Sequence, residues 1–176
     1  MHHSAQQFVE NTVRMLNLNR PGLTVLEIGS YNVNGTVRGA FSRTDYTGVD
    51  FEAGPGVDVV ADITQVEWEP EKFDVVVCCE VLEHIEEPLA IVEAAHLLLK
   101  PSGVLILTCA SPGRPRHSGR QRPFDPEVDF YRNVKEEQLD QWVAMFDRHI
   151  ITRKRHHCDF HVVAWKRNTE QEVDIE

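Results

Sequence analysis

Five short apolar runs constrain the fold of this 176-residue chain more than any other feature of its sequence. Two of them, FDVVVCC (73–79) and GVLILTCA (103–110), have apolar side chains at successive positions, so a strand formed by either run is apolar on both faces. Parallel strands covered by helices on both sides have this pattern. The other three runs are LTVLEI (23–28), YTGVDF (46–51) and VDVVAD (57–62).

Helical patterns separate these runs. Apolar residues recur at helical spacing in three segments, which predicts a capping helix within 1–20 and helices over 86–100 and 133–146. GTVRGAF (35–41) is compatible with the start of a further helix. The link of about ten residues before FDVVVCC has no helical pattern, so we expect an irregular crossover there. The alternating order predicts an α/β fold.

The C-terminal part follows a different pattern. HIITRKRH (149–156) and DFHVVAWKR (159–167) are strand-like runs joined by a tight turn, so we expect an antiparallel hairpin that closes the sheet. Residues 111–132 form the longest segment without a regular pattern, and a loop of this length is typically a lid or substrate-binding loop. We expect 1–176 to form a single domain with a frayed polar tail over 168–176.

Charge and hydropathy limit the partners. The formal net charge is −10, which opposes attraction to phosphate backbones, so a nucleic acid is disfavoured and a small-molecule substrate is expected. No run reaches the roughly 18 apolar residues that cross a bilayer. The four cysteines form no CxxC pair, and three lie in strand-like runs, so we expect reduced core thiols and a cytoplasmic protein with no membrane partner. The oligomeric state is not indicated.

Polar residues and glycines follow the strand-like runs at one edge of the expected sheet. The stretch EIGSYNVNG contains Gly29 and Gly35, which let the backbone approach a ligand where a Cβ atom would collide. Asp50 follows Gly29 by 21 residues, the spacing at which a carboxylate accepts hydrogen bonds from both hydroxyls of a ribose. Ligands of doubly wound sheets bind at the carboxyl ends of the strands. These features predict an adenosine-like ligand.

At these residues the chain resembles the class I S-adenosylmethionine-dependent methyltransferases, specifically the small-molecule, type 11-like kind. Members share a motif like VLEIGS followed by NG, and a later one like FDVVVCCEVLEHIEEP. The resemblance covers residues 23–166. It implies a single Rossmann-like three-layer domain, a mostly parallel seven-stranded sheet with an antiparallel C-terminal hairpin, and an enzyme that uses S-adenosyl-L-methionine.

The resemblance also assigns roles by position around the cofactor. It implies that the methionine part of the cofactor is lined by Glu27, Gly29 and Ser30, and that the ribose is held by Asp50. It also implies that the adenine is contacted by Phe51, Asp62 and Ile63, and that Glu80 and Val81 lie near the sulfonium end. Gly35 closes the same loop. The bulky Tyr31 departs from the family pattern and is either a lid on the methionine tail or a surface residue.

The loop 111–132 supplies candidates for acceptor binding. Four arginines precede its first acid and either grip an anionic or sugar-like acceptor or simply keep the loop solvated: Arg114, Arg116, Arg120 and Arg122. A base is needed only if the acceptor loses its proton early. The candidates for it are His84, His117, Asp129 and Tyr131, of which Tyr131 alternatively orients the substrate.

Three alternatives remain open at this point. Glu80, Glu83 and His84 resemble a metal-binding set if His117 joins them, but local packing of the histidine is the better interpretation, so no metal is predicted. A nicotinamide-dependent oxidoreductase would also use an acid like Asp50, yet it needs G-x-G-x-x-G after the first strand. A nucleic-acid methyltransferase and a non-catalytic cofactor-binding protein complete the alternatives.

Overall fold

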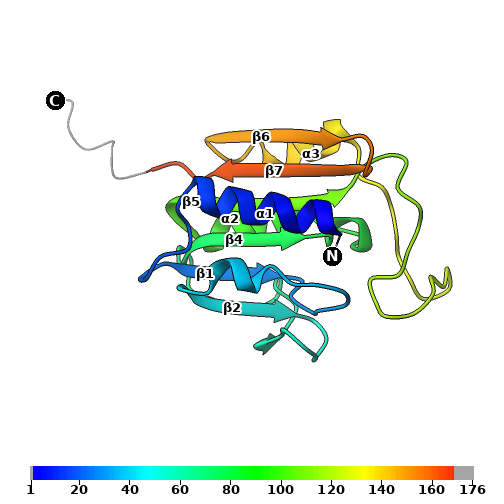
Figure 1. The fold of residues 1–176 in the computed structure, drawn as a ribbon, viewed down its shortest axis with the longest axis horizontal. Helices are drawn as coiled ribbons and strands as arrows, with labels where there is room; N and C mark the ends of the chain where they lie inside the picture. The colour runs from blue at the N-terminus through cyan, green and yellow to red at the C-terminus, as the bar shows by residue number, and fades with distance from the viewer. Residues whose placement is uncertain (1, 169–176) are drawn as a thin grey trace.

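The computed structural model describes residues 2–168, which form one seven-stranded sheet with helices on both faces (Figure 1). The strands are β1 (Thr24–Ile28), β2 (Asp45–Asp50), β3 (Val59–Val60), β4 (Phe73–Cys79), β5 (Leu99–Ala110), β6 (Arg148–Lys154) and β7 (Asp159–Trp165). Their order across the sheet is β3-β2-β1-β4-β5-β7-β6. Pairing is parallel from β3 to β5, and β7 runs antiparallel to both β5 and β6. The predicted mostly parallel sheet with a C-terminal antiparallel hairpin is confirmed.

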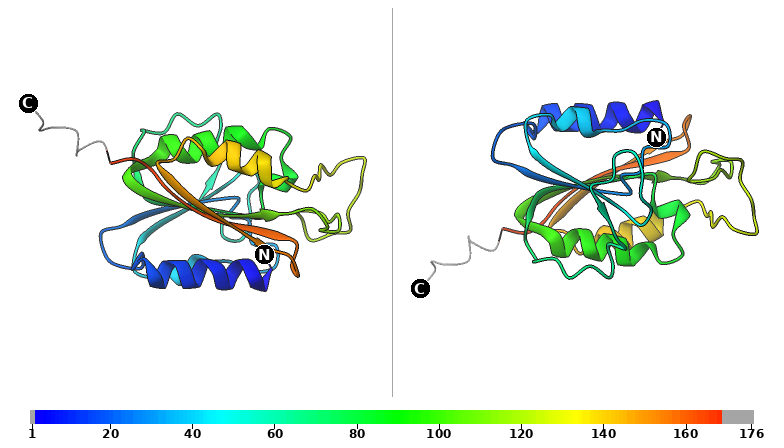
Figure 2. Two further views of the ribbon diagram at one scale, coloured as in Figure 1. Left: turned by 90° about the horizontal axis from the view of Figure 1, so that it is seen from above. Right: turned by 90° about the horizontal axis from the view of Figure 1, so that it is seen from below.

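Two helical layers cover this sheet and complete the three-layer arrangement. The helices are α1 (His3–Met15), α2 (Pro88–Leu98) and α3 (Glu136–Val143), with short 3-10 helices η1 (Arg38–Phe41) and η2 (Leu82–His84). Figure 2 shows α1 on one face of the sheet and α2 with α3 on the other. The segments connecting the strands therefore place apolar side chains against both faces.

The alternation of side chains along β4 explains why its sequence is apolar from Val75 to Cys79. Val75 and Val77 pack in the core beneath α1, whereas Val76 and Cys78 pack in the core beneath α2 and α3. Successive side chains of a strand point to opposite faces, so a central strand needs apolar residues at every position. All four cysteines are free thiols, as the sequence predicted.

Several element boundaries differ from the sequence prediction. The strand predicted over 57–62 is only two residues long, because the Asp58 carboxylate accepts the Gly48 N–H at 2.7 Å where a ladder would use a backbone carbonyl. The predicted start of a helix at 35–41 is only the 3-10 helix η1, which packs beside α1 on the face that a longer helix would occupy. The irregular crossover between β3 and β4 is confirmed, since no helix lies there.

The other helices are shorter than their sequence patterns. α2 ends at Leu98 instead of continuing to 100, because β5 begins at Leu99, four residues before the predicted strand. The extra strand residues pair irregularly, with a register shift near Phe73 and a left-handed backbone at Ser102 (φ +64°). α3 is confined to the central eight residues of the helix predicted over 133–146.

The segment 111–132 contains no helix or strand and extends beyond the carboxyl end of β5 (Figure 1). The tail predicted to fray over 168–176 lies, except for Asn168, outside the described residues. Within the described chain, none of the helices has the length and hydropathy required to span a bilayer.

Candidate active site

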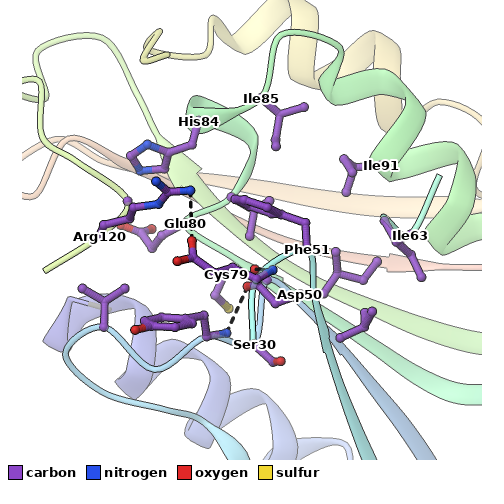
Figure 3. Close-up of a pocket in the computed structure, with 18 of the residues that line it drawn as sticks. Ser30, Asp50, Phe51, Ile63, Cys79, Glu80, His84, Ile85, Ile91 and Arg120 are labelled. Atoms are coloured by element: carbon purple, nitrogen blue, oxygen red, sulfur yellow. Dashed lines mark hydrogen bonds and ion pairs between the residues drawn. The ribbon is translucent and has the colours of Figure 1, made fainter. Parts of the chain in front are cut away.

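A cleft of about 690 Å³ opens at the carboxyl ends of β1, β2 and β4 and is bordered by the loop 111–132 (Figure 3). Its volume falls within the usual range for small-molecule sites. All eleven residues predicted to contact the cofactor line it: Glu27, Gly29, Ser30, Tyr31, Gly35, Asp50, Phe51, Asp62, Ile63, Glu80 and Val81. Parallel strands bring these dispersed residues together because their carboxyl ends share one edge of the sheet.

The loop after β1 takes a conformation that only glycine adopts readily at its first turn. Gly29 has φ +76°, and a Cβ atom built there would lie 2.2 Å from Cγ2 of Val81. The loop is also tied to the end of β2, since the Asp50 carboxylate accepts the backbone N–H of Tyr31 at 3.1 Å and that of Glu52 at 3.2 Å. Asp50 is thereby fixed at the mouth of the cleft (Figure 3).

Glu27 is a carboxyl group buried within β1, with 3% of its surface exposed. Burial raises its pKa from 4.5 to about 7, and the Tyr46 hydroxyl opposes this by donating a hydrogen bond of 2.7 Å. Sequence reasoning missed Tyr46 as the partner. The pairing register of β1 and β2 explains why the two side chains meet: Gly48 lies opposite Glu27, and Tyr46, two residues earlier on β2, faces the same side of the sheet.

The nucleoside end of the cleft combines a turn-capping acid with apolar surface. Asp62 accepts hydrogen bonds from the Thr64 N–H at 2.9 Å and its hydroxyl at 2.7 Å, both on one carboxylate oxygen. Ile63 is buried, whereas Phe51 is 64% exposed. An exposed aromatic ring at the end of a strand offers a flat surface to a planar ligand.

Glu80 has a strained backbone and a fully paired side chain. Its φ is +58°, a left-handed conformation that is uncommon for a residue other than glycine. One carboxylate oxygen accepts the Thr108 hydroxyl at 3.0 Å, and the other accepts the Arg114 guanidinium at 3.1 Å. Arg114 also donates to Asp159 at 2.9 Å, and the burial of Asp159 raises the pKa of that carboxyl to about 7.

Only one of the four loop arginines predicted to bind the acceptor lines the cleft. Arg114 lies outside it, held between Glu80 and Asp159, so its guanidinium is committed to the fold. Arg122 forms a two-pronged ion pair with Asp129 at 2.7 and 2.8 Å, and Arg116 is exposed away from the cleft. These three arginines are therefore not among the residues that line the cleft, and acceptor binding by them stays a prediction.

Arg120 lies at the mouth of the cleft, between His84 and Phe51 in the view of Figure 3. It forms an ion pair of 2.9 Å with Glu52. Among the described residues, the lining contains this one arginine and eight acids, which are Glu27, Asp50, Glu52, Asp62, Glu80, Glu86, Glu87 and Asp129. The cleft thus carries an excess of negative charge, a property that the sequence did not reveal.

Of the four residues predicted as possible bases, not all line the cleft. His84, His117 and Asp129 line the cleft, but Tyr131 does not. The N–H of Asp125 and the Arg122 guanidinium hold the pKa of the Asp129 carboxyl below its usual range, which makes it a poor proton acceptor. Tyr131 is buried, and burial raises the pKa of its phenol; its ring contacts both imidazoles, with centroids 5.2 and 4.8 Å away.

The two imidazoles have ring centroids 5.1 Å apart. Nδ1 of His117 lies 3.1 Å from the Pro115 carbonyl, which only accepts, so Nδ1 carries the proton and Nε2 keeps a lone pair in the neutral ring. Burial lowers the pKa of His84 to about 4, with a hydrogen bond to the backbone of Phe130 opposing the change. His84 is therefore neutral at pH 7.

Glu83, His84 and His117 place possible metal-ligating atoms within 4.8 Å of one another. Glu83 is completely buried: Oε1 accepts the Ala110 N–H at 3.1 Å, and Oε2 has no partner among the described residues. Burial, and to a smaller extent the negative charge of Glu80, raises the pKa of this carboxyl well above its usual value. Glu80, the other acid of the E-x-x-E-H motif, is paired with Arg114 instead. The absence of a metal stays a prediction.

The N-terminus supplies a lining residue that sequence reasoning missed. Nε2 of His2 lies 3.9 Å from Oε2 of Glu80, and the His2 ring is 5.9 Å from that of His117. Burial lowers the pKa of His2 to about 4. No sequence signal links positions 2, 80 and 117, because their proximity depends on how α1 packs across the sheet.

Comparison with known proteins decides what kind of site this is. A family profile described as a methyltransferase domain matches residues 1–168. The chain belongs to this methyltransferase family. This family is dependent on S-adenosyl-L-methionine, and the residues of the cleft are compatible with that cofactor: carboxylates lie at two strand ends, an aromatic ring is exposed, and the backbone of a glycine turn borders the cleft.

Curated relatives of this methyltransferase match only in part. A ubiquinone biosynthesis O-methyltransferase of Paraburkholderia phytofirmans is 40% identical over an alignment of 97 residues that covers 47% of this chain and 42% of the relative. One of Haemophilus ducreyi is 55% identical over 38 residues, 22% of this chain and 16% of the relative. The chain thus matches less than half the length of these relatives.

Solved structures support the fold of the methyltransferase over nearly its whole length. The Burkholderia thailandensis 1,6-didemethyltoxoflavin-N1-methyltransferase, solved with its substrate and S-adenosylhomocysteine, has a TM-score of 0.66 at 19% identity and covers 93% of this chain and 79% of its own. The PH0226 protein of Pyrococcus horikoshii has a TM-score of 0.68 at 15% identity, with coverages of 93% and 90%. At these identities the likeness establishes the fold alone.

Proposed function

We propose that this methyltransferase transfers the methyl group of S-adenosylmethionine to a hydroxyl oxygen of a small acceptor that carries no negative charge. The observation that carries this proposal is a pair of imidazoles, those of His84 and His117, in a cleft that combines apolar side chains with an excess of acids over basic residues. When bound, the cofactor supplies an electrophilic methyl group on a sulfonium. The protein's task is then to align the acceptor with that methyl group and to remove the acceptor's proton.

The cofactor assignments follow the cleft from one end to the other. Asp50 accepts the ribose hydroxyls, Phe51 and Ile63 contact the adenine, and the remaining oxygen of Asp62 accepts its amine. The methionine part lies along Glu27, Gly29, Ser30, Tyr31 and Gly35, and the sulfonium end lies near Glu80 and Val81. The excess of carboxylates supports this arrangement, because a cationic sulfonium is attracted to a negative cleft.

The same charge argues against an anionic acceptor. Eight acids and one arginine line the cleft, and that arginine is already paired with Glu52. Arg114 and Arg122 pair with two more of these acids, which still leaves an excess of carboxyl groups. A carboxylate or phosphate on the acceptor would be repelled, whereas an uncharged ring would pack against the apolar side chains of Ile85 and Phe130, which line the cleft beside His84. The anionic or sugar-like acceptor expected from the loop arginines therefore loses its support.

We assign the proton-accepting role to His117. Its Nδ1–H is bound to the Pro115 carbonyl, so the lone pair on Nε2 remains available for a hydroxyl proton. His84 stays neutral and orients the ring of His117 through their edge contact. The partial matches to relatives named as O-methyltransferases support oxygen as the attacking atom.

An acceptor screen tests the proposal directly. We expect a neutral phenol to be methylated on oxygen, the same phenol with an added ring carboxylate to react at least tenfold more slowly, and an aniline of the same shape not to react. His117→Gln should lower kcat at neutral pH, whereas Arg116→Gln, a change on the exposed part of the same loop, should not. Faster methylation of the carboxylated phenol would overturn the proposal.

The other interpretations make different predictions in the same screen. An RNA methyltransferase would label RNA in preference to small phenols, which the net charge of −10 disfavours. A protein that only binds the cofactor would retain S-adenosylhomocysteine but label no acceptor. A nicotinamide-dependent enzyme would bind NAD in place of S-adenosylhomocysteine, an outcome at odds with the family assignment. A cytoplasmic location is part of the proposal.

A further inference from the structure

The segment 117–121 of the long loop crosses the mouth of the cleft from its acceptor end to its nucleoside end. At one end the His117 ring contacts His84, and Gly119 lies beside the His84 ring, where a Cβ atom built on it would be in ordinary van der Waals contact at 3.5 Å. At the other end Arg120 reaches Glu52 beyond the end of β2, and Gln121 donates to the Val33 carbonyl. We call this segment the strap.

At the nucleoside end, the side chains of the strap contact other segments that line the cleft and not residues of their own loop. Glu52 and Val33 belong to the loops after β2 and β1, and both line the cleft. The Arg120 guanidinium also lies 5.8 Å from the centre of the exposed Phe51 ring. The shape of the loop is maintained by the pair of Arg122 with Asp129 and by the Ser118 hydroxyl, which donates to Asp129 at 3.3 Å and accepts the Arg120 N–H at 3.2 Å.

The strength of this closure is limited by its exposure to water. Arg120 and Glu52 are each about half exposed, with 48% and 47% of their side-chain surface accessible. Ion pairs of this kind are weak and are screened by salt. The strap is therefore closed but easily released, in contrast to the base of the loop, where Arg114 is 9% exposed between two carboxylates.

We propose that the Arg120–Glu52 ion pair is a latch that controls exchange of the cofactor. A cofactor whose nucleoside lies at Phe51 passes beneath the strap both when it enters and when it leaves. Opening of the latch therefore limits both association and dissociation, and Arg120 is a positioning residue for the strap. This inference depends on the cofactor and on the place of its nucleoside, and it is independent of the acceptor's identity.

The test measures the kinetics of S-adenosylhomocysteine exchange by surface plasmon resonance on the immobilised protein. This probe is suitable because it carries no net charge, so changes in long-range attraction to the acidic cleft stay small. For Arg120→Gln and for Glu52→Gln we expect the association and dissociation rate constants both to rise by roughly two- to fivefold, with Kd almost unchanged. Arg116→Gln is the matched control and should leave both rate constants unchanged.

A charge-swapped pair provides the second variant. Arg120→Glu combined with Glu52→Arg should restore slow exchange, and raised salt should accelerate the wild type but not Arg120→Gln. If Arg120→Gln raises only the dissociation rate constant, Arg120 simply contacts the ligand and the latch is refuted. Unchanged rate constants in both single variants would also refute it. Failure of the wild type to bind S-adenosylhomocysteine would instead refute the cofactor assignment.

Discussion

Replacing Glu27 by glutamine tests the electrostatics at the centre of the cleft. Burial raises the pKa of this carboxyl from 4.5 to about 7, so the folded protein holds a proton that the unfolded chain has already lost between these pH values. The group's contribution to stability therefore falls as pH rises from 4.5 to 7 and stays at its lowest value above pH 7. One pH unit corresponds to about 1.4 kcal/mol, which gives a cost of ionisation of about 3 kcal/mol.

Glutamine removes this cost and keeps an oxygen that can accept the Tyr46 hydroxyl. We expect the unfolding free energy of Glu27→Gln minus that of the wild type to increase by about 2.5 kcal/mol between pH 5 and pH 8, because a small part of the cost is already present at pH 5. Comparing the two pH values removes any constant cost of burying the amide. Urea denaturation at several pH values measures the change, and Asp159, which titrates near pH 7, is common to both proteins.

Glu93→Gln on the exposed face of α2 is the matched control and should show no such pH dependence. A constant difference between Glu27→Gln and the wild type across this pH range would refute the reasoning, because it would mean that Glu27 ionises at its ordinary pKa despite its burial. The proposed role near the methionine part adds a further readout. In Glu27→Gln, binding of S-adenosylhomocysteine should weaken and lose its pH dependence near pH 7.

Three further changes test other parts of the structure. Gly29→Ala should lower the unfolding free energy by about 2 kcal/mol or more, because it combines a left-handed backbone with a collision; a melting temperature equal to wild type would contradict this. Arg114→Met should destabilise by about 3 kcal/mol at pH 8 and by less at pH 5, where Asp159 is protonated; an equal loss at both pH values would exclude the ion-pair explanation. Titration with Zn²⁺ or Mg²⁺ should give no saturable heat, whereas binding that Glu83→Gln abolishes would show a metal site.

The strands and their ligand-binding edge could be predicted because they depend on local patterns. β4 was predicted with its observed limits, since its seven residues include a short run of β-branched and apolar side chains that is typical of a buried strand. The positions after the strands were equally predictable, because the carboxyl ends of parallel strands share one edge. The limits of β3, η1 and β5 were not, since they depend on a side-chain hydrogen bond, on the packing of α1 and on an irregular register.

The loop 111–132 shows where sequence reasoning fails. Its arginines look equivalent in the sequence, yet Arg114 is buried between carboxylates, Arg122 pairs with an acid of its own loop, and Arg120 alone lines the cleft. The partners that decide these roles lie 7 to 68 positions away in the chain. A guanidinium pairs with whichever carboxylate the fold brings near it, so spacing alone cannot assign its function.

The sequence by itself therefore determined the α/β fold, the edge of the sheet that binds the ligand and the class of cofactor. Apolar periodicity and the glycine and carboxylate positions after the strands act through local geometry, so they can be recognised without a structure. Only the tertiary structure decided the charge of the cleft, the pairing of the imidazoles and the strap across its mouth. These properties arise from side chains of distant segments, whose pKa values and ion pairs depend on burial and separation in space.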